Sequence, residues 1–227
     1  MSAFKLWTDP QHWEKTERKR KERERLYAQK ESLRKQTACF TGHRPNKLGG
    51  YNMRNPIMLQ LKKKLLEVIE IAILEEGITR FISGGALGFD QASFWCVHIL
   101  KKEKYPHIKN IVAIPFANQP KLWTDVQKYW YKKMLSLADD VIDVSKLKEY
   151  STKETSVIPI EEYSKAKMQK RNEYMVDHSR LIIAAYDGSK GGTANCLRYA
   201  MKKWDREIWI LDPKYNFERS VHYTFSF

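Results

Sequence analysis

The sequence is poor in cysteine and has no long apolar run. Its three cysteines, Cys39, Cys96 and Cys196, are an odd number, have no CxxC spacing and lie in or beside apolar segments. This pattern predicts reduced thiols in the core of a cytoplasmic protein rather than a disulfide framework. No apolar run approaches the ~20 residues that span a bilayer. Because an apolar leader segment is also missing from the first residues, we expect no signal peptide and no membrane partner.

Several familiar signatures are absent as well. Histidine, cysteine and acidic residues are nowhere spaced as metal ligands, so we expect neither a metal nor another cofactor. The chain lacks the Gly-Lys-Ser/Thr of a Walker loop and the G-x-G-x-x-G of a dinucleotide fingerprint. It also has no long internal repeat. The charge balance and the glycine-rich turns therefore carry most of the functional information.

Acidic residues are few relative to basic ones. The 227 residues include 41 Lys and Arg against 27 Asp and Glu, which gives a formal net charge of +14. The excess is shared between residues 1–36 and the rest of the chain. A basic surface favours polyanions, from nucleotides to nucleic acid, without choosing between them. The length and the 42% hydrophobic content suit one domain with an extension.

Residues 1–36 differ from the rest in composition. Residues 14–35 form a mixed-charge run in which the sign alternates and nothing breaks a helix, which predicts a solvated helix. Its front apolar residues are expected to pack on the body of the protein: Phe4, Leu6, Trp7 and Trp13. A basic arm that binds DNA or RNA is the alternative. We therefore divide the chain into a charged helical extension, 1–36, and a domain, 37–227.

From residue 37 onward, β-rich segments alternate with segments of helical periodicity. We expect strands at 36–41, 78–82, 110–116, 140–144, 181–186 and 207–211, and helices that start at residues 56, 91, 119, 165 and 194. Residues 145–163 show no periodicity and are interpreted as a long loop, and 221–227 alternate as an added edge strand. This alternation is typical of an α/β, Rossmann-like, doubly wound and mostly parallel sheet.

The most informative turn is Ser83-Gly84-Gly85-Ala86-Leu87-Gly88-Phe89-Asp90, between an expected strand and an expected helix. Its glycines permit positive φ and let backbone N–H groups approach a ligand, and the helix start adds a partial positive charge. These properties suit phosphate. The alternative is a tight turn that packs closely for structural reasons.

Two further turns follow expected strands. The first carries Arg44, a fixed cation with a forked donor that suits phosphate, and the second carries Gly191-Gly192-Thr193 at a helix start. In doubly wound sheets, ligands bind beyond the carboxyl ends of the strands. All three turns therefore belong to one edge, where backbone amides would hold phosphate and Asp90 would take ribose hydroxyls. Helix capping by Asp90 or Thr193, and a structural role for His43, are the alternatives.

These residues resemble the SLOG superfamily, and within it the small, mostly uncharacterised SLOG proteins of Gram-positive bacteria and their phages. Five motifs carry the resemblance: Thr41-Gly42-His43-Arg44-Pro45, Ser83 to Asp90, Gln119 with Trp123, Arg171-Asn172-x-x-Met175-Val176-Asp177-x-Ser179, and Tyr186-Asp187-Gly188 with Gly191-Gly192-Thr193. It spans residues 37–212. We expect ligand contacts from Thr41, Gly42, His43, Arg44, Ser83, Gly84, Gly85, Gly88, Asp90, Gln119, Arg171, Asn172, Asp187, Gly191, Gly192 and Thr193.

The resemblance implies a Rossmann-like fold, shared by cytokinin-activating phosphoribohydrolases, the DNA-processing protein DprA and sensors of nucleotide-derived signals. The phosphoribohydrolases carry a catalytic glutamate soon after their glycine-rich turn, whereas here residues 194–198 hold no carboxylate. We therefore expect a protein that binds a nucleotide-like small molecule as a sensor or sequestering agent. The alternatives are an N-glycosidic hydrolase that uses Asp90 or His43, and a DprA-like binder of single-stranded DNA. Enzymatic activity and homo-oligomer formation remain open.

Overall fold

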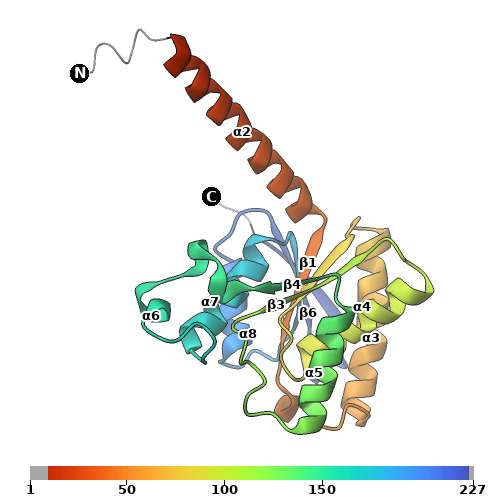
Figure 1. Cartoon of the computed structure of the whole chain (residues 1–227). Coiled ribbons are helices and arrows are strands. Elements are labelled where there is room, and N and C mark those ends of the chain that lie inside the picture. The colour runs from red at the N-terminus through yellow and green to blue at the C-terminus, as the bar shows by residue number, and fades with distance from the viewer. Residues whose placement is uncertain (1–9, 225–227) are drawn as a thin grey trace.

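The computed structural model describes residues 10–224 and contains one seven-stranded sheet with helices on both faces (Figure 1). The strand order is β4-β3-β2-β1-β5-β6-β7. Strands β1 to β6 are parallel and β7 runs antiparallel beside β6. The strands are β1 (Thr37–Gly42), β2 (Arg80–Ser83), β3 (Lys109–Ile114), β4 (Asp140–Asp143), β5 (Leu181–Ala185), β6 (Arg206–Leu211) and β7 (Arg219–Thr224). The predicted Rossmann-like α/β fold is confirmed.

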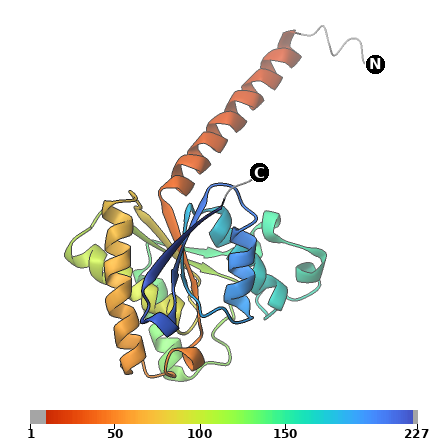
Figure 2. The same cartoon turned by 180° about the vertical axis from the view of Figure 1, so that it is seen from behind.

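The central strands bury both faces, which explains why their sequences are almost wholly apolar. Ala38 and Phe40 of β1 face a core with helices α3 (Pro56–Leu74) and α4 (Phe89–Glu103). Cys39 faces the opposite core, with α7 (Lys165–Asp177) and α8 (Gly192–Ala200). Figures 1 and 2 show these two helix pairs on opposite faces of the sheet. None of the helices between residues 10 and 224 is both long and apolar enough to cross a membrane.

Three predicted segments differ most from the structure. The helix expected from residue 119 is α5 (Asp125–Leu137), which begins later because Thr124 and Gln127 form a capping box. The aperiodic segment 145–163 contains short helical turns: η2 (Val144–Lys146), η3 (Lys148–Tyr150) and α6 (Lys153–Ser156). The edge strand starts before residue 221, and residues 225–227 lie outside the described part. The remaining short turns are η1 (Pro45–Lys47) and η4 (Pro213–Tyr215).

Helix α2 (Pro10–Lys35) projects away from the sheet, as Figures 1 and 2 show. Ion pairs of Arg20 with Glu17 and Glu24 run along its surface and support an isolated helix. Trp13 lies in the first turn of α2, at the end that projects away from the sheet, so the expected packing of this residue on the body is wrong. Phe4, Leu6 and Trp7 lie outside the described residues.

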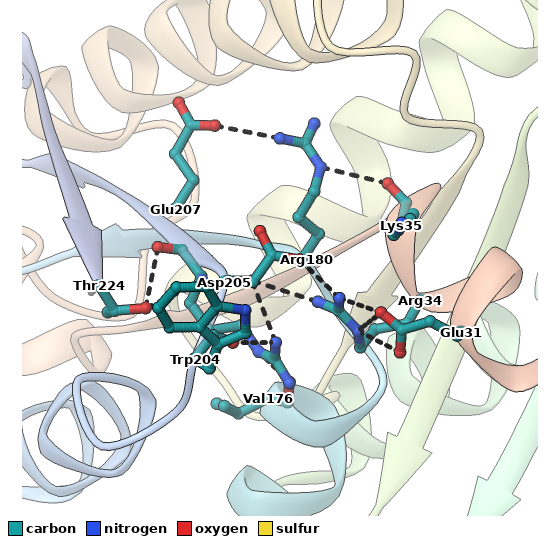
Figure 3. Close-up of polar contacts among 10 residues, drawn as sticks. Glu31, Arg34, Lys35, Val176, Arg180, Trp204, Asp205, Glu207 and Thr224 are labelled. Atoms are coloured by element: carbon teal, nitrogen blue, oxygen red, sulfur yellow. Dashed lines mark hydrogen bonds and ion pairs between the residues drawn. The ribbon is translucent and has the colours of Figure 1, made fainter. Parts of the chain in front are cut away.

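The last turn of α2 is fixed to the amino-terminal edge of the sheet (Figure 3). The Arg34 guanidinium pairs with Glu31 and donates to the Asp205 carboxylate over 2.7 Å and to the Asp205 carbonyl over 3.2 Å. The backbone N–H of Arg180 donates to the carbonyl of Arg34, and its side chain donates to the carbonyl of Lys35. Since these partners precede β1, β5 and β6, the extension is held at the edge opposite the carboxyl ends of the strands.

We expect Arg34→Ala to lower the free energy of unfolding by about 1–3 kcal/mol, because a nearly buried guanidinium loses charged hydrogen bonds on both sides of the junction. Urea unfolding followed by circular dichroism measures this change. Arg20→Ala is the matched control, since Arg20 forms ion pairs only within exposed α2 and such pairs contribute little. Equal losses in the two variants would contradict the anchoring role of Arg34.

Candidate functional site

A cleft opens at the carboxyl edge of the sheet, where β1 lies between β2 and β5 and the strand order reverses. Ligands of doubly wound folds bind at this position. The cavity measures about 260 Å³ and is called the polar cleft below. Among the predicted ligand residues, those that line it are Thr41, Gly42, His43, Arg44, Asp90, Arg171, Asn172, Gly191, Gly192 and Thr193. Sequence reasoning missed six others: Asn46, Lys47, Ala86, Met168, Ser189 and Lys190.

Five predicted residues stand behind this lining rather than in it: Ser83, Gly84, Gly85, Gly88 and Asp187. The two glycines at positive φ, Gly85 at +68° and Gly88 at +98°, shape the turn between β2 and α4. A Cβ on Gly88 would lie 2.7 Å from the carbonyl oxygen of His43. The glycine-rich turn therefore packs directly against the turn after β1, which lines the polar cleft.

A buried ion pair lies across the glycine-rich turn. Nη1 of Arg171 donates to Oδ2 of Asp90 over 3.3 Å, and the backbone N–H of Ala86 reaches the same oxygen over 3.4 Å. A Cβ on Gly84 would lie 1.4 Å from Nη1 of Arg171, so only glycine leaves room for the guanidinium. Burial raises the pKa of Asp90, while Arg171 and Arg44 oppose that shift. Since α4 has Gly88 as its N-cap, without a side-chain cap, Asp90 holds the turn rather than capping the helix.

His43 and Asp187 connect the turns after β1 and β5. The backbone N–H of Asp187 donates to Nε2 of His43 over 3.1 Å. Burial lowers the pKa of His43, while the Asp187 carboxylate, whose Oδ1 lies 2.9 Å from Nε2, opposes that shift. Burial acts to raise the pKa of Asp187, but hydrogen bonds from Ser189 and Lys47 hold it well below its usual range. Asp187 thus connects the turn after β5 to the turn after β1, and both turns line the cleft.

We expect His43 to make the fold less stable in mild acid. Near and below pH ~6.5 the unfolded chain binds a proton on this imidazole more readily than the folded protein does, so stability falls with falling pH. The slope is at most about 1.4 kcal/mol per pH unit for one proton. His43→Gln keeps an acceptor for the Asp187 N–H and should flatten the profile. Urea unfolding between about pH 7.5 and pH 5 compares the two proteins, and parallel profiles would contradict this role.

Two arginines with unpaired donors line the polar cleft. The Arg44 side chain makes no hydrogen bond or ion pair with any residue of the described range 10–224. Nε of Arg171 is buried and also lacks an acceptor there. Guanidinium groups present a fork that matches the oxygens of phosphate. The polar cleft is therefore prepared electrostatically for an anion.

The start of α8 adds backbone donors to the same cleft. Its N-cap is Gly191, at a φ of +152°, and no side chain caps the helix, so Thr193 does not act as a cap. The first N–H groups of a helix have no partner within it and attract anions. A Cβ on Gly192 would meet nothing within 4 Å. The start of α8 and the two arginines thus line the same cavity.

A second cavity, of about 370 Å³, adjoins the polar cleft and is called the aromatic compartment below. It is lined by Arg44, Phe116, Asn118, Gln119, Lys121, Leu122, Trp123, Glu162, Tyr163 and Met168. The predicted residue Gln119 lies here rather than in the polar cleft. Its carbonyl accepts from Tyr131 Oη over 3.0 Å, and its amide reaches the carbonyl of Gly84 at 3.5 Å. Gln119 therefore ties the loop after β3 to the glycine-rich turn.

Comparison with known proteins now identifies the fold family. The sequence model of the YspA SLOG family matches residues 38–214. The chain belongs to this family. The SPbeta prophage-derived protein YoqJ of Bacillus subtilis (strain 168), named as uncharacterized, is 58% identical over 172 residues, which cover 75% of this chain and 98% of YoqJ. A UPF0398 protein of Lysinibacillus sphaericus (strain C3-41) is 36% identical over 107 residues, which cover 47% of this chain and 59% of that protein.

Among solved structures, the DNA processing protein A (DprA) of Streptococcus pneumoniae matches with a TM-score of 0.49 and 20% sequence identity. The match covers 78% of this chain and 50% of the DprA chain, so this SLOG protein spans about half the length of DprA.

The acidic chemistry of this SLOG cleft is limited. Asp90 is the one carboxylate that lines it within residues 10–224, and it is paired with Arg171. Helix α8 contributes no carboxylate. No group of three His, Cys, Asp or Glu side chains in the described part could hold a metal ion. The hydrogen-bond donors in the cleft outnumber the side chains that could move a proton.

Proposed function

We propose that this SLOG protein binds a nucleotide or nucleotide-derived molecule in the polar cleft and acts as a sensor or sequestering protein. The observation that carries the proposal is the Arg44 guanidinium, which lines the cleft without an acceptor in the described structure. A cationic donor and open helix-start amides in one cavity suit the charge and the hydrogen-bonding oxygens of phosphate.

The remaining lining residues suit a sugar. Both described contacts of the Asp90 carboxylate go to Oδ2, which leaves Oδ1 for a ribose hydroxyl. Thr41 and Asn172 are buried polar side chains at the floor and offer further hydrogen bonds. Phosphate at the start of α8 and ribose near Asp90 is the assignment that we infer.

Hydrolysis of an N-glycosidic bond is supported less well. A carboxylate that acts as a general acid or base must reach the scissile bond and exchange protons there. The Asp90 carboxylate instead accepts from a buried guanidinium and a backbone amide. We therefore treat hydrolysis as an outcome of the test rather than as a second proposal.

The test starts from mass spectrometry of small molecules released when the purified protein is denatured. Calorimetry then measures ribose 5-phosphate, the four nucleoside monophosphates and ADP-ribose against the intact chain. A released nucleotide, or saturable binding of one of these probes, is expected. Absence of both would overturn the proposal. Steady release of free base, seen by liquid chromatography, would make the protein a hydrolase, and oligonucleotide binding that weakens steeply with salt would make it a nucleic-acid binder.

A further inference from the structure

The aromatic compartment and the polar cleft share two wall residues, Arg44 and Met168. A phosphate held beside Arg44 therefore has a second cavity within reach of the same arginine. That cavity is the larger of the two, at about 370 Å³ against 260 Å³, and half of its ten lining residues are apolar or aromatic. A ligand with a charged part and a flat apolar part fits such a pair of cavities.

Large apolar side chains stand open to solvent in this compartment. Tyr163 is 61% exposed, and its ring meets the buried Phe116 edge to face at 6.0 Å. Leu122 is 94% exposed. Trp123 is partly buried and packs edge to face on Tyr131 at 5.1 Å. Exposed apolar side chains that cluster beside a polar cavity indicate a binding surface, whereas singly scattered ones do not.

The wall that carries Tyr163 is held in shape from inside. The buried ammonium of Lys167 donates to three carbonyls of residues 159–162: Pro159 over 2.6 Å, Ile160 over 3.2 Å and Glu162 over 3.0 Å. A charged donor bound by three backbone acceptors fixes the course of a loop that has no regular secondary structure. The backbone that leads to Tyr163 is therefore held in place by the fold.

The two walls are also tied to each other. The backbone N–H of Asn118 donates to the carbonyl of Glu161 over 3.1 Å, and Lys121 pairs with Glu162 over 3.0 Å. These bonds join the loop that carries Trp123 to the loop that carries Tyr163. The compartment is thus preorganised, which reduces the ordering cost of binding.

We propose that the aromatic compartment receives the nucleobase of a nucleotide whose phosphate lies beside Arg44, an inference that rests on the function proposed above. A planar base has two π-faces and stacks on tyrosine and tryptophan rings. The protein therefore prefers nucleotides to sugar phosphates that lack a base.

The preference is measured by calorimetry with ribose 5-phosphate and with whichever nucleoside monophosphate binds the wild type most tightly. Tyr163→Ala and Trp123→Ala should weaken the nucleotide at least about fivefold, the lower end for base–aromatic stacking, and leave ribose 5-phosphate unchanged. Tyr129→Ala is the matched control, because Tyr129 is 62% exposed on α5 and lines neither cavity. It should leave both affinities unchanged.

The outcomes distinguish a failure of the base assignment from a failure of the proposed function. If wild type binds the nucleotide and ribose 5-phosphate equally, or if Tyr163→Ala has no more effect than Tyr129→Ala, the base assignment fails and the phosphate cleft stands. If neither probe binds wild type, the proposed function fails and the base assignment with it. If Trp123→Ala does not fold, the Tyr163→Ala variant alone tests the base assignment, because Tyr163 is exposed.

Discussion

Gly84→Ala is expected to weaken the binding of ribose 5-phosphate about a hundredfold, the upper value for a lost hydrogen bond to a charged group. The added methyl carbon would stand 1.4 Å from Nη1 of Arg171 and 2.5 Å from Oδ2 of Asp90. Neither group can stay where it is. Because Arg171 also forms the wall of the polar cleft, its displacement removes a cationic donor and changes the shape of the cavity.

The same substitution should lower the free energy of unfolding by about 3 kcal/mol, because separation of a buried ion pair leaves charges uncompensated. The Arg171 and Asp90 side chains are 5% and 7% exposed, so water cannot replace the lost partner of either group. A long side chain at the surface would simply swing away from the methyl group. The Arg171 side chain is buried and has no such freedom.

Gly192→Ala is the matched control for this effect. A Cβ there meets nothing within 4 Å, and Gly192 does not adopt a positive φ. Alanine in the first turn of α8 should keep the unfolding midpoint at or above that of wild type, since alanine restricts the unfolded chain more than glycine does. Urea unfolding of both variants decides the point. Equal stability of Gly84→Ala and Gly192→Ala would show that the ion pair does not depend on glycine.

This contrast shows what the sequence could not reveal about its glycines. Gly84, Gly88 and Gly192 all occur in glycine-rich turns before helices, and the sequence treats them alike. In the structure Gly84 makes room for a side chain of α7, Gly88 adopts a positive φ, and Gly192 does neither. The first of these reasons is a tertiary contact with Arg171, which no local pattern encodes.

The fold itself was accessible from the sequence because each element carries its own physical signal. Apolar runs predicted the buried parallel strands, and the rule that ligands bind where strand order reverses placed three turns at one edge. The helix α2 was evident from alternating charge. The contact expected for Trp13 was wrong because the charge pattern says nothing about where a helix points.

The aromatic compartment was missed through one misplaced helix start. Gln119-Pro120 resembles the beginning of a helix, which assigned Trp123 to a core-facing helical position. The sequence Thr124-x-x-Gln127 carries a capping-box signature and marks the true start of α5. With that start, Trp123 belongs to a loop. Tyr163 lies in an aperiodic segment whose shape depends on the buried ammonium of Lys167, so only the folded chain reveals its position.

Arg44→Ala is expected to weaken binding of a nucleoside monophosphate about ten- to hundredfold, the range for hydrogen bonds to charged groups. The corresponding nucleoside, which lacks phosphate, should lose little affinity because the guanidinium then has no anion to pair with. Stability should not change, since the Arg44 side chain is exposed and makes no hydrogen bond or ion pair within residues 10–224. Calorimetry with the nucleotide and nucleoside, beside urea unfolding, measures all three.

Arg44→Lys sharpens the interpretation. Lysine keeps the charge but loses the planar fork, so an intermediate loss indicates bidentate contact with phosphate, and full retention indicates a purely electrostatic role. Equal losses for nucleotide and nucleoside in Arg44→Ala would defeat the phosphate role. Arg44 lines both cavities, so such a result would instead assign it to the base, stacked as a flat cation beside the aromatic walls. The loss of affinity for the nucleotide relative to the loss for the nucleoside therefore determines in which of the two cavities Arg44 contacts the ligand.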